Sequence, residues 1–193
     1  MHKVIAFNCS PRKDGNTAIL LNAALAEIKK QGFETELVQL AGRPLHGCTG
    51  CMGCWRNKDR GCVLPDDGLN ACVEKMAGAA GILIGSPTYF ADVSSEAKAL
   101  IDRAGMVGLA NGALYRRKAG AAVIAVRRGG AVHAFDSINH FFTISQMVIP
   151  GSNYWNMGVG RDKGEVEKDE EGMATMKVLG ENMAWLLSRI AGG

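Results

Sequence analysis

Short apolar runs alternate with longer amphipathic stretches along the chain. Five segments have the length and the β-branched or alternating content of strands, and they cover residues 3–8, 34–40, 81–85, 118–126 and 147–150. Between them, apolar residues recur at helical spacing. This spacing predicts helices over residues 18–30, 67–77, 94–103, 132–146 and 173–190. A long loop is expected between the last strand and the last helix.

Residues at the predicted boundaries agree with this division. Gly32 follows the first helix, as a C-terminal glycine often does. Asp66 and Asp67 offer an N-cap to the second helix, and Ser94 or Ser95 offers one to the third.

Strand–helix alternation of this kind predicts an α/β fold, with a parallel sheet and helices on both faces. Five strands fit a flavodoxin-like three-layer sandwich with the strand order 2-1-3-4-5. We expect one domain over residues 1–193, with a Cys-rich loop insertion at about 44–65. Ligands of such folds bind outside the carboxyl ends of the strands, which directs attention to the loops after the first, third and fourth strands.

Composition narrows the class of protein. Hydrophobic residues make up 47% and charged residues 21% of the 193 residues, an ordinary globular balance for one domain. The net charge of +3 is too small to indicate nucleic-acid binding, although it suits a site that attracts anionic cofactors. No apolar run approaches a membrane helix or a signal-peptide core. We therefore expect a soluble, cytoplasmic protein that does not enter a membrane.

The loop after the first strand combines a helix start with polar side chains. Unpaired N–H groups and the helix dipole favour an anion at such a start. The residues expected to contact the anion are Ser10, Arg12, Gly15, Asn16 and Thr17. The arrangement suits a phosphate monoester, and the alternative is a turn whose polar residues only cap the helix. Neither the nucleoside-triphosphate motif nor the dinucleotide glycine fingerprint is present.

The loops after the third and fourth strands offer two aromatic side chains and a cluster of positive charge. Tyr89 and Phe90 follow the third strand and can stack on or flank a planar ring, although an aromatic pair in a loop can also be ordinary packing. Residues 127–130 form a turn with two arginines and two glycines after the fourth strand. A positive charge there can meet the polar edge of a ring, and the alternative is a solvated basic turn.

The cysteines are unevenly distributed. Four of the six lie within one short segment, namely Cys48, Cys51, Cys54 and Cys62. The spacing C-x2-C-x2-C-x7-C allows each thiolate to hold one corner of a cubane iron–sulfur cluster. Zinc fits less well because zinc sites usually use two separated pairs, and reduced or redox-labile thiols are the remaining alternative. Cys9 and Cys72 are expected to be small core residues.

Taken together, residues 3–17, 86–90 and 96–103 resemble the NADPH-dependent FMN reductase superfamily. With the cysteine run added, the chain is similar to the iron–sulfur flavoprotein branch of that superfamily. The resemblance implies a [4Fe–4S] cluster on the four clustered cysteines. It also implies a homodimer or homotetramer with flavin sites near the subunit contacts.

The resemblance also implies a set of FMN-binding residues. The phosphate would be held by Ser10, Arg12, Asn16 and Thr17, and the ring would be flanked by Pro87, Thr88, Tyr89 and Phe90. Independently of the resemblance, the charge of the turn after the fourth strand suggests that Arg127, with Gly129 and Gly130, lies at the pyrimidine edge of the flavin. A positive charge there stabilises the anionic reduced form.

These features predict an FMN-dependent oxidoreductase that accepts hydride from NAD(P)H and passes electrons to a small acceptor such as a quinone or free flavin. Hydride transfer needs no acid–base residue, and no catalytic dyad is recognisable, so no catalytic residue is assigned. The alternative is an electron carrier in which ferredoxin passes single electrons through the cluster to FMN. A flavin-binding sensor without turnover is a third hypothesis.

Overall fold

A five-stranded parallel sheet forms the centre of the described part of the molecule. The structure, a computed structural model, describes residues 2–65 and 67–190. The strands follow the order β2-β1-β3-β4-β5, which confirms the expected flavodoxin-like order. Their bounds are β1 Lys3–Asn8, β2 Glu34–Gln39, β3 Gly81–Pro87, β4 Ala119–Val126 and β5 Met157–Val159.

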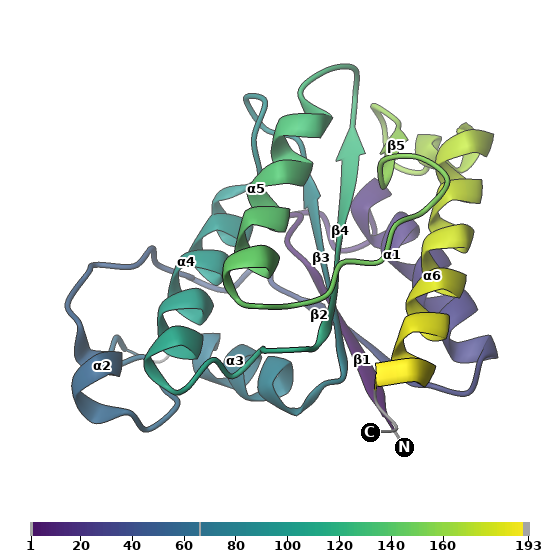
Figure 1. Ribbon diagram of the computed structural model, residues 1–193. Coiled ribbons are helices and arrows are strands. Elements are labelled where there is room, and N and C mark those ends of the chain that lie inside the picture. The colour runs from purple at the N-terminus through teal and green to yellow at the C-terminus, as the bar shows by residue number, and fades with distance from the viewer. Residues whose placement is uncertain (1, 66, 191–193) are drawn as a thin grey trace.

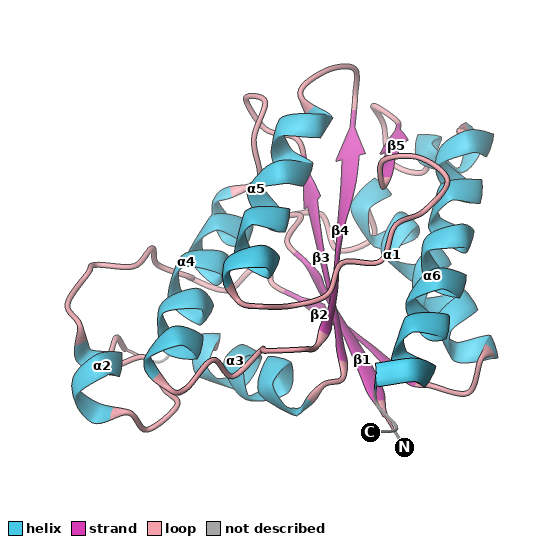
Figure 2. Cartoon of the chain, in the orientation of Figure 1, coloured by secondary structure: helices cyan, strands magenta, loops and turns pink. Residues whose placement is uncertain are grey.

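Helices cover both faces of this sheet, giving three layers (Figures 1 and 2). One face carries α1 Asn16–Lys30 and α6 Glu170–Ile190. The other face carries α3 Leu69–Gly78, α4 Ser95–Ala110 and α5 Ala131–Ile144. The short helix α2 Gly53–Asn57 lies in the Cys-rich segment, beyond α4 in Figure 1. A 3₁₀ turn, η1 Glu165–Lys168, precedes α6.

Strand β1 shows how the sheet is buried on both sides. Val4 and Ala6 pack in the core beneath α1 and α6, whereas Ile5 and Phe7 pack in the core beneath α3, α4 and α5. Successive side chains of a strand point to opposite faces, so a strand covered by helices on both sides needs a continuous apolar run. This is the pattern from which the sequence predicts β1.

The fifth strand was wrongly placed by the sequence pattern. Residues 147–150 were expected to form it, but the strand that pairs with the far half of β4 is Met157–Val159. Within the expected segment, Val148 forms an isolated parallel bridge with Ala119. The segment ends at Pro150, whose nitrogen has no hydrogen to donate to a ladder.

Strand β5 was missed because it has no apolar run. Gly158 is its buried residue, and a side chain there would come within 2.6 Å of Val166 and 2.7 Å of Leu20. Glycine therefore allows the strand to lie close against η1 and α1. This position brings residues 160–161 to the carboxyl end of the sheet, which the sequence did not predict.

Helix α3 begins differently from the expected capping pattern. Its N-cap is Gly68, in a left-handed conformation, and Asp66 lies outside the described residues. Asp67 accepts a hydrogen bond from the Leu69 backbone N–H at 3.2 Å, but its other oxygen is directed toward α4. The acidic residue expected as a cap thus has a second, tertiary role.

Helix α4 is longer than expected. It is capped by Ser94, whose hydroxyl accepts from the Ala97 N–H at 3.2 Å, and it continues to Ala110 rather than ending at Arg103. The extension places Arg103 in the middle of the helix, against the Cys-rich segment. In the part of the chain that the structure describes, no helix has the length and apolarity needed to cross a membrane.

Candidate functional site

A pocket lies at the carboxyl ends of β1, β3 and β4, at the top of the sheet in Figure 1; we call it the strand-end pocket. It contains about 550 Å³ of empty space, part of which is open to solvent. The residues that line it are Ser10, Arg12, Gly15, Asn16, Thr17, Pro87, Thr88, Tyr89, Ala125, Arg127, Gly160 and Arg161. Most of the expected residues therefore meet in one place, as the topology requires.

Three expected residues do not line the strand-end pocket. Phe90 is fully exposed, and Gly129 is exposed on the turn after β4. Gly130 packs elsewhere, because a side chain there would come within 2.7 Å of the Ala91 Cα. Its φ of +87° is also a conformation that glycine adopts at little cost. Gly130 thus allows α5 to begin close to the turn after β3.

The loop after β1 is held by a buried polar network that the sequence pattern did not reveal. Asn8 Nδ2 donates to the Gln39 side chain at 2.5 Å and to the Lys13 carbonyl at 3.2 Å. Asn8 Oδ1 accepts from the Ser10 N–H at 3.2 Å, and Gln39 Nε2 donates to the Ser10 carbonyl at 2.8 Å. The Ser10 hydroxyl in turn accepts from the Arg12 N–H at 3.1 Å. The loop is therefore held in place by hydrogen bonds within the chain itself.

The start of α1 is left available to an anion. Its N-cap is Gly15, and in the described chain no side chain caps the helix and no acidic residue occupies its first turn. Helix α4, which begins nearby, is instead capped by Ser94. An uncapped helix start presents free N–H groups and the positive end of the dipole. Three exposed arginines add positive charge around the pocket, namely Arg12, Arg127 and Arg161.

Asn16 has a different immediate role from the one the sequence predicts. Its Nδ2 donates to the carbonyls of Gly160 at 3.1 Å and Asp162 at 3.0 Å, and its Oδ1 accepts from the Gly164 N–H at 2.9 Å. The side-chain amide therefore binds the loop after β5 to the start of α1. Its side chain shapes the pocket wall, and its backbone N–H stays at the helix start.

The turn after β3 is tightly held. Tyr89 and Asp92 exchange backbone hydrogen bonds of 2.8 and 3.0 Å around Phe90 and Ala91, whose φ values are +48° and +62°. Asp92 Oδ1 accepts from the Val93 N–H and from the Ser137 hydroxyl, both at 2.7 Å. Burial opposes the ionisation of Asp92, but these hydrogen bonds hold its pKa below the usual range. The turn points Phe90 into solvent and leaves Tyr89 half-exposed beside the pocket.

Thr88, a residue that lines the strand-end pocket, has a buried side-chain oxygen without a partner in the described chain. Thr88 Oγ1 is buried and makes no hydrogen bond within the described chain, although the Thr88 N–H donates to the Ala125 carbonyl at 2.9 Å. An unpaired buried hydroxyl costs roughly 1–3 kcal/mol. A ligand with a polar ring edge would relieve that cost.

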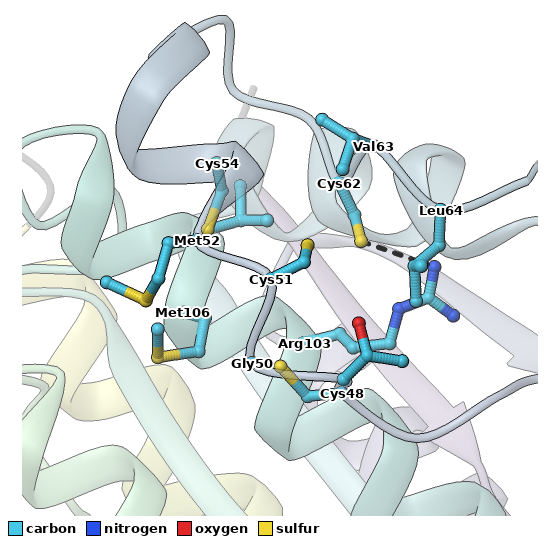
Figure 3. Close-up of a pocket in the computed structure, with 12 residues that line it drawn as sticks. Cys48, Gly50, Cys51, Met52, Cys54, Cys62, Val63, Leu64, Arg103 and Met106 are labelled. Carbon is cyan, nitrogen blue, oxygen red and sulfur yellow. Dashed lines mark hydrogen bonds between the residues drawn. The ribbon is translucent and has the colours of Figure 1, made fainter.

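A second pocket lies beside α4, and we call it the cysteine pocket. Only about 20 Å³ of it admits a water-sized molecule, and all four clustered cysteines line it. Figure 3 shows Cys48, Cys51, Cys54 and Cys62 among the residues that line this pocket, with the Arg103 guanidinium beside Cys62. In the described residues, no group of three or more His, Cys, Asp or Glu side chains is arranged to hold a metal ion.

The cysteines differ in environment. Cys9 and Cys72 are buried, as expected, and burial raises the pKa of both thiols. Cys48 and Cys51 are exposed. The pKa of Cys51 is lowered by hydrogen bonds from the Gly53 N–H and the Thr49 side chain. Cys54 is buried and burial raises its pKa, whereas Cys62 is half-buried. The four cysteines that line the cysteine pocket therefore include both exposed and buried thiols.

The base of the cysteine segment is closed by a buried ion pair. Arg103 Nη1 hydrogen-bonds to the Asp67 carboxylate and donates to the His46 carbonyl at 3.1 Å. The same carboxylate accepts from the His46 N–H at 3.1 Å. Both ends of the segment are thereby joined to the middle of α4. The sequence pattern gave no sign of this pair, since neither residue belongs to a recognisable metal or cofactor motif.

Comparison with known proteins assigns the family. The NADPH-dependent FMN reductase family model matches residues 2–162. An iron–sulfur flavoprotein of Methanocaldococcus jannaschii is 38% identical, over 97% of this chain and 98% of that protein. An iron–sulfur flavoprotein of Methanosarcina thermophila is 33% identical, over 97% of this chain and 96% of that protein.

Solved structures show the same fold at low sequence identity. RosB, with a bound 8-demethyl-8-formylriboflavin-5′-phosphate intermediate, has a TM-score of 0.77 at 15% identity and covers 100% of this chain and 81% of its own. The NAD(P)H:quinone oxidoreductase of Methanothermobacter marburgensis has a TM-score of 0.69 at 15% identity. The match covers 95% of this chain and 98% of that protein. From the sequence matches, supported by this fold, the chain belongs to the NADPH-dependent FMN reductase family and falls in its iron–sulfur flavoprotein branch.

Proposed function

We propose that the protein is an oxidoreductase that binds FMN in the strand-end pocket. Two features of the residues that line this pocket carry the proposal. The start of α1 has no side-chain cap, and the Thr88 hydroxyl is buried without a partner in the described chain. The first suits a phosphate and the second suits the polar edge of a planar ring. FMN contains both groups at opposite ends of one molecule.

Each part of the pocket then has a role toward the cofactor. Ser10, Arg12 and Thr17, with the backbone N–H groups at the start of α1, would hold the phosphate. The segment Pro87, Thr88 and Tyr89 would flank the ring, and Arg127 would place positive charge at its edge. When bound, FMN supplies both hydride acceptance and single-electron transfer. The chain's own contribution is to position it and stabilise its negative charge.

The cysteine pocket supports a second redox group, a [4Fe–4S] cluster on Cys48, Cys51, Cys54 and Cys62. A cubane cluster takes one thiolate at each of four corners, so its ligands surround a hollow instead of meeting at one point. All four clustered cysteines line the cysteine pocket (Figure 3). Their presence around one pocket supports the proposal of a shared cluster.

The two pockets suggest an electron carrier as the first function. Ser94, at the start of α4, donates to the Cys9 carbonyl beneath the strand-end pocket, whereas Met106 lines the cysteine pocket. Ser94 and Met106 are twelve residues apart, which corresponds to about 18 Å along the axis of α4. We propose that one-electron donors such as ferredoxin reduce the cluster, and that electrons reach FMN across a contact between copies in a homodimer or homotetramer.

Hydride transfer from NAD(P)H is the second candidate function. It is favoured by the openness of the strand-end pocket to solvent and by the half-exposed position of Tyr89. These features leave room for a nicotinamide beside the ring. A small acceptor such as a quinone or a flavin could then use the same opening.

Absorption spectroscopy of protein purified without oxygen tests both redox groups, together with FMN, iron and acid-labile sulfide per chain. We expect one FMN and four irons. Protein that binds no FMN on reconstitution would contradict the proposal for the strand-end pocket. Iron-free protein, after both anaerobic purification and chemical reconstitution, would contradict the cluster.

Stopped-flow reduction separates the two donors. Rapid bleaching of the flavin by reduced ferredoxin, with slow bleaching by NADH and NADPH, supports the carrier. The reverse order supports the hydride reductase. The Cys51→Ser variant sharpens the test, because a hydride reductase keeps its rate without the cluster whereas the carrier loses it.

A further inference from the structure

Arg103 is the largest fully buried side chain in the described chain, yet the proposed function gives it no role. Its side chain is 1% exposed and that of Asp67 is 5% exposed. A buried guanidinium without a partner would be strongly unfavourable, and Asp67 neutralises it. Well-packed apolar residues often replace such a pair at no cost in stability. The presence of the pair therefore calls for an explanation beyond packing.

The guanidinium has more donors than Asp67 uses. Nη1 is occupied by the Asp67 carboxylate and the His46 carbonyl. Nη2 donates to Cys62 Sγ at 3.5 Å, which is the dashed line in Figure 3. Nε is buried and has no partner in the described chain, and Arg103 lines the cysteine pocket. Nη2 thus reaches Cys62, a residue that lines the cysteine pocket, and Nε is a further donor that the ion pair does not use.

This geometry has a physical consequence for a redox group in the cysteine pocket. A cluster held by four thiolates is anionic and gains one more negative charge on reduction. Hydrogen bonds to the ligand sulfurs stabilise the more negative state, and such bonds are among the factors that set cluster potentials. The interaction is stronger in a buried setting than in water.

We propose that Arg103, oriented by Asp67, is a positioning residue that holds the Cys62 sulfur and raises the reduction potential of the cluster. The inference rests on the proposed [4Fe–4S] cluster and adds a device that adjusts its potential. Asp67 fixes the direction of the guanidinium fork. Cys62, the ligand separated from the other three by the longest gap, is the sulfur that this fork reaches.

Two variants test this proposal. Arg103→Lys keeps the charge and a partner for Asp67, but an ammonium cannot offer a rigid fork to Asp67 and Cys62 together. The double variant Arg103→Gln with Asp67→Asn removes both charges and leaves neither buried alone. The control is Arg60→Gln, which removes an exposed positive charge from the same segment.

The measurement is the midpoint potential of the cluster in an anaerobic redox titration, with iron, sulfide and FMN determined for each sample. We expect both test variants to retain FMN and to shift the cluster to lower potential. The expected size is a roughly tenfold weaker reduction equilibrium, or about 59 mV for a one-electron couple. The control should stay near the wild-type value, because an exposed charge is screened.

The possible outcomes are distinct. Loss of iron from both test variants, with FMN retained, would support the part of the proposal that concerns holding Cys62. Unshifted potentials with intact clusters would overturn the proposal, as would loss of FMN together with iron, which indicates a purely structural ion pair. Absence of a cluster from the wild-type protein would instead contradict the proposed function on which the inference depends.

Discussion

The strand-end pocket and the cysteine pocket are built in different ways. The first is formed by segments that leave neighbouring strands of one sheet, and its loops are tied by networks such as Asn8 with Gln39 and Asn16 with Gly160. The second is formed mostly by one segment outside the sheet. Both regions contain non-glycine residues in left-handed conformations, namely Phe90 and Ala91 in the turn after β3 and Met52, Lys58 and Arg60 in the cysteine segment.

The two pockets differ in what holds their loops and segments in place. The topology of the sheet places the strand-end loops together whether or not a ligand is bound. In the cysteine segment, non-glycine residues in left-handed conformations cost about 1 kcal/mol or more each. The Arg103–Asp67 pair and the packing on α4 must offset that strain. The comparison predicts that the two pockets can be disrupted independently.

The largest effect is expected for Cys51→Ser. Removing one thiolate from the proposed cluster should abolish iron binding, while FMN per chain stays unchanged because the strand-end pocket shares no residue with this segment. Iron and FMN analyses of anaerobically prepared protein measure this effect. Cys72→Ala is the control, since it removes a buried core thiol outside the run and should keep its iron. Joint loss of FMN and iron from Cys51→Ser would show that the pockets are coupled.

A smaller effect, on the opposite pocket, is expected for Asn16→Ala. The change removes three hydrogen bonds that hold residues 160–164 against α1. We expect a roughly tenfold higher Kd for FMN, about 1.4 kcal/mol, because part of the loss is recovered by water. Fluorescence titration of the FMN-free protein measures it. The exposed Asn22→Ala on the same helix should leave the Kd unchanged, and an equal effect of both variants would argue against a role for this loop.

Thr88→Val should separate binding from stability. Valine has nearly the same shape, but it lacks the hydroxyl that is buried without a partner. FMN affinity should fall by about 1 kcal/mol, roughly fivefold, if the ring edge uses this hydroxyl. The free energy of unfolding of the FMN-free protein should stay constant or rise. Thr88→Ser, which keeps the hydroxyl, should retain the affinity; weaker binding by Ser than by Val would refute this assignment.

The smallest effect concerns Glu36, which is remote from both pockets. Hydrogen bonds from Lys3 and Lys75 lower its pKa, so its contribution to stability is complete above the ordinary glutamate value of about 4.3 and is lost as the pH falls through the lower folded-state pKa. Relative to Glu36→Gln, wild-type stability should be greater by a few tenths of a kcal/mol at neutral pH. Chemical denaturation between pH 3 and 7 checks this, and a difference that grows on acidification would contradict the sign.

Local features of the chain explain which strands and pocket residues the sequence patterns predicted and which they did not. The strand β1 and the loop after it were predictable because a buried parallel strand needs a continuous apolar run and the loop begins a helix. Strand β5 was not predictable, since three residues centred on Gly158 have no periodicity. Arg161 was missed with it, because its place in the pocket depends on that strand.

The sequence by itself determined the alternation of strands and helices, four of the five described strands, the three pocket loops after β1, β3 and β4, and the grouping of four cysteines. These properties follow from local periodicity, turn residues and spacing, which a linear chain displays directly. Only the tertiary structure decided that the Asn16 amide binds residues 160–164 and that Asp67 meets Arg103 across the base of the cysteine segment. Such contacts join residues far apart in the chain, and their energies depend on burial and direction, which residue types alone do not specify.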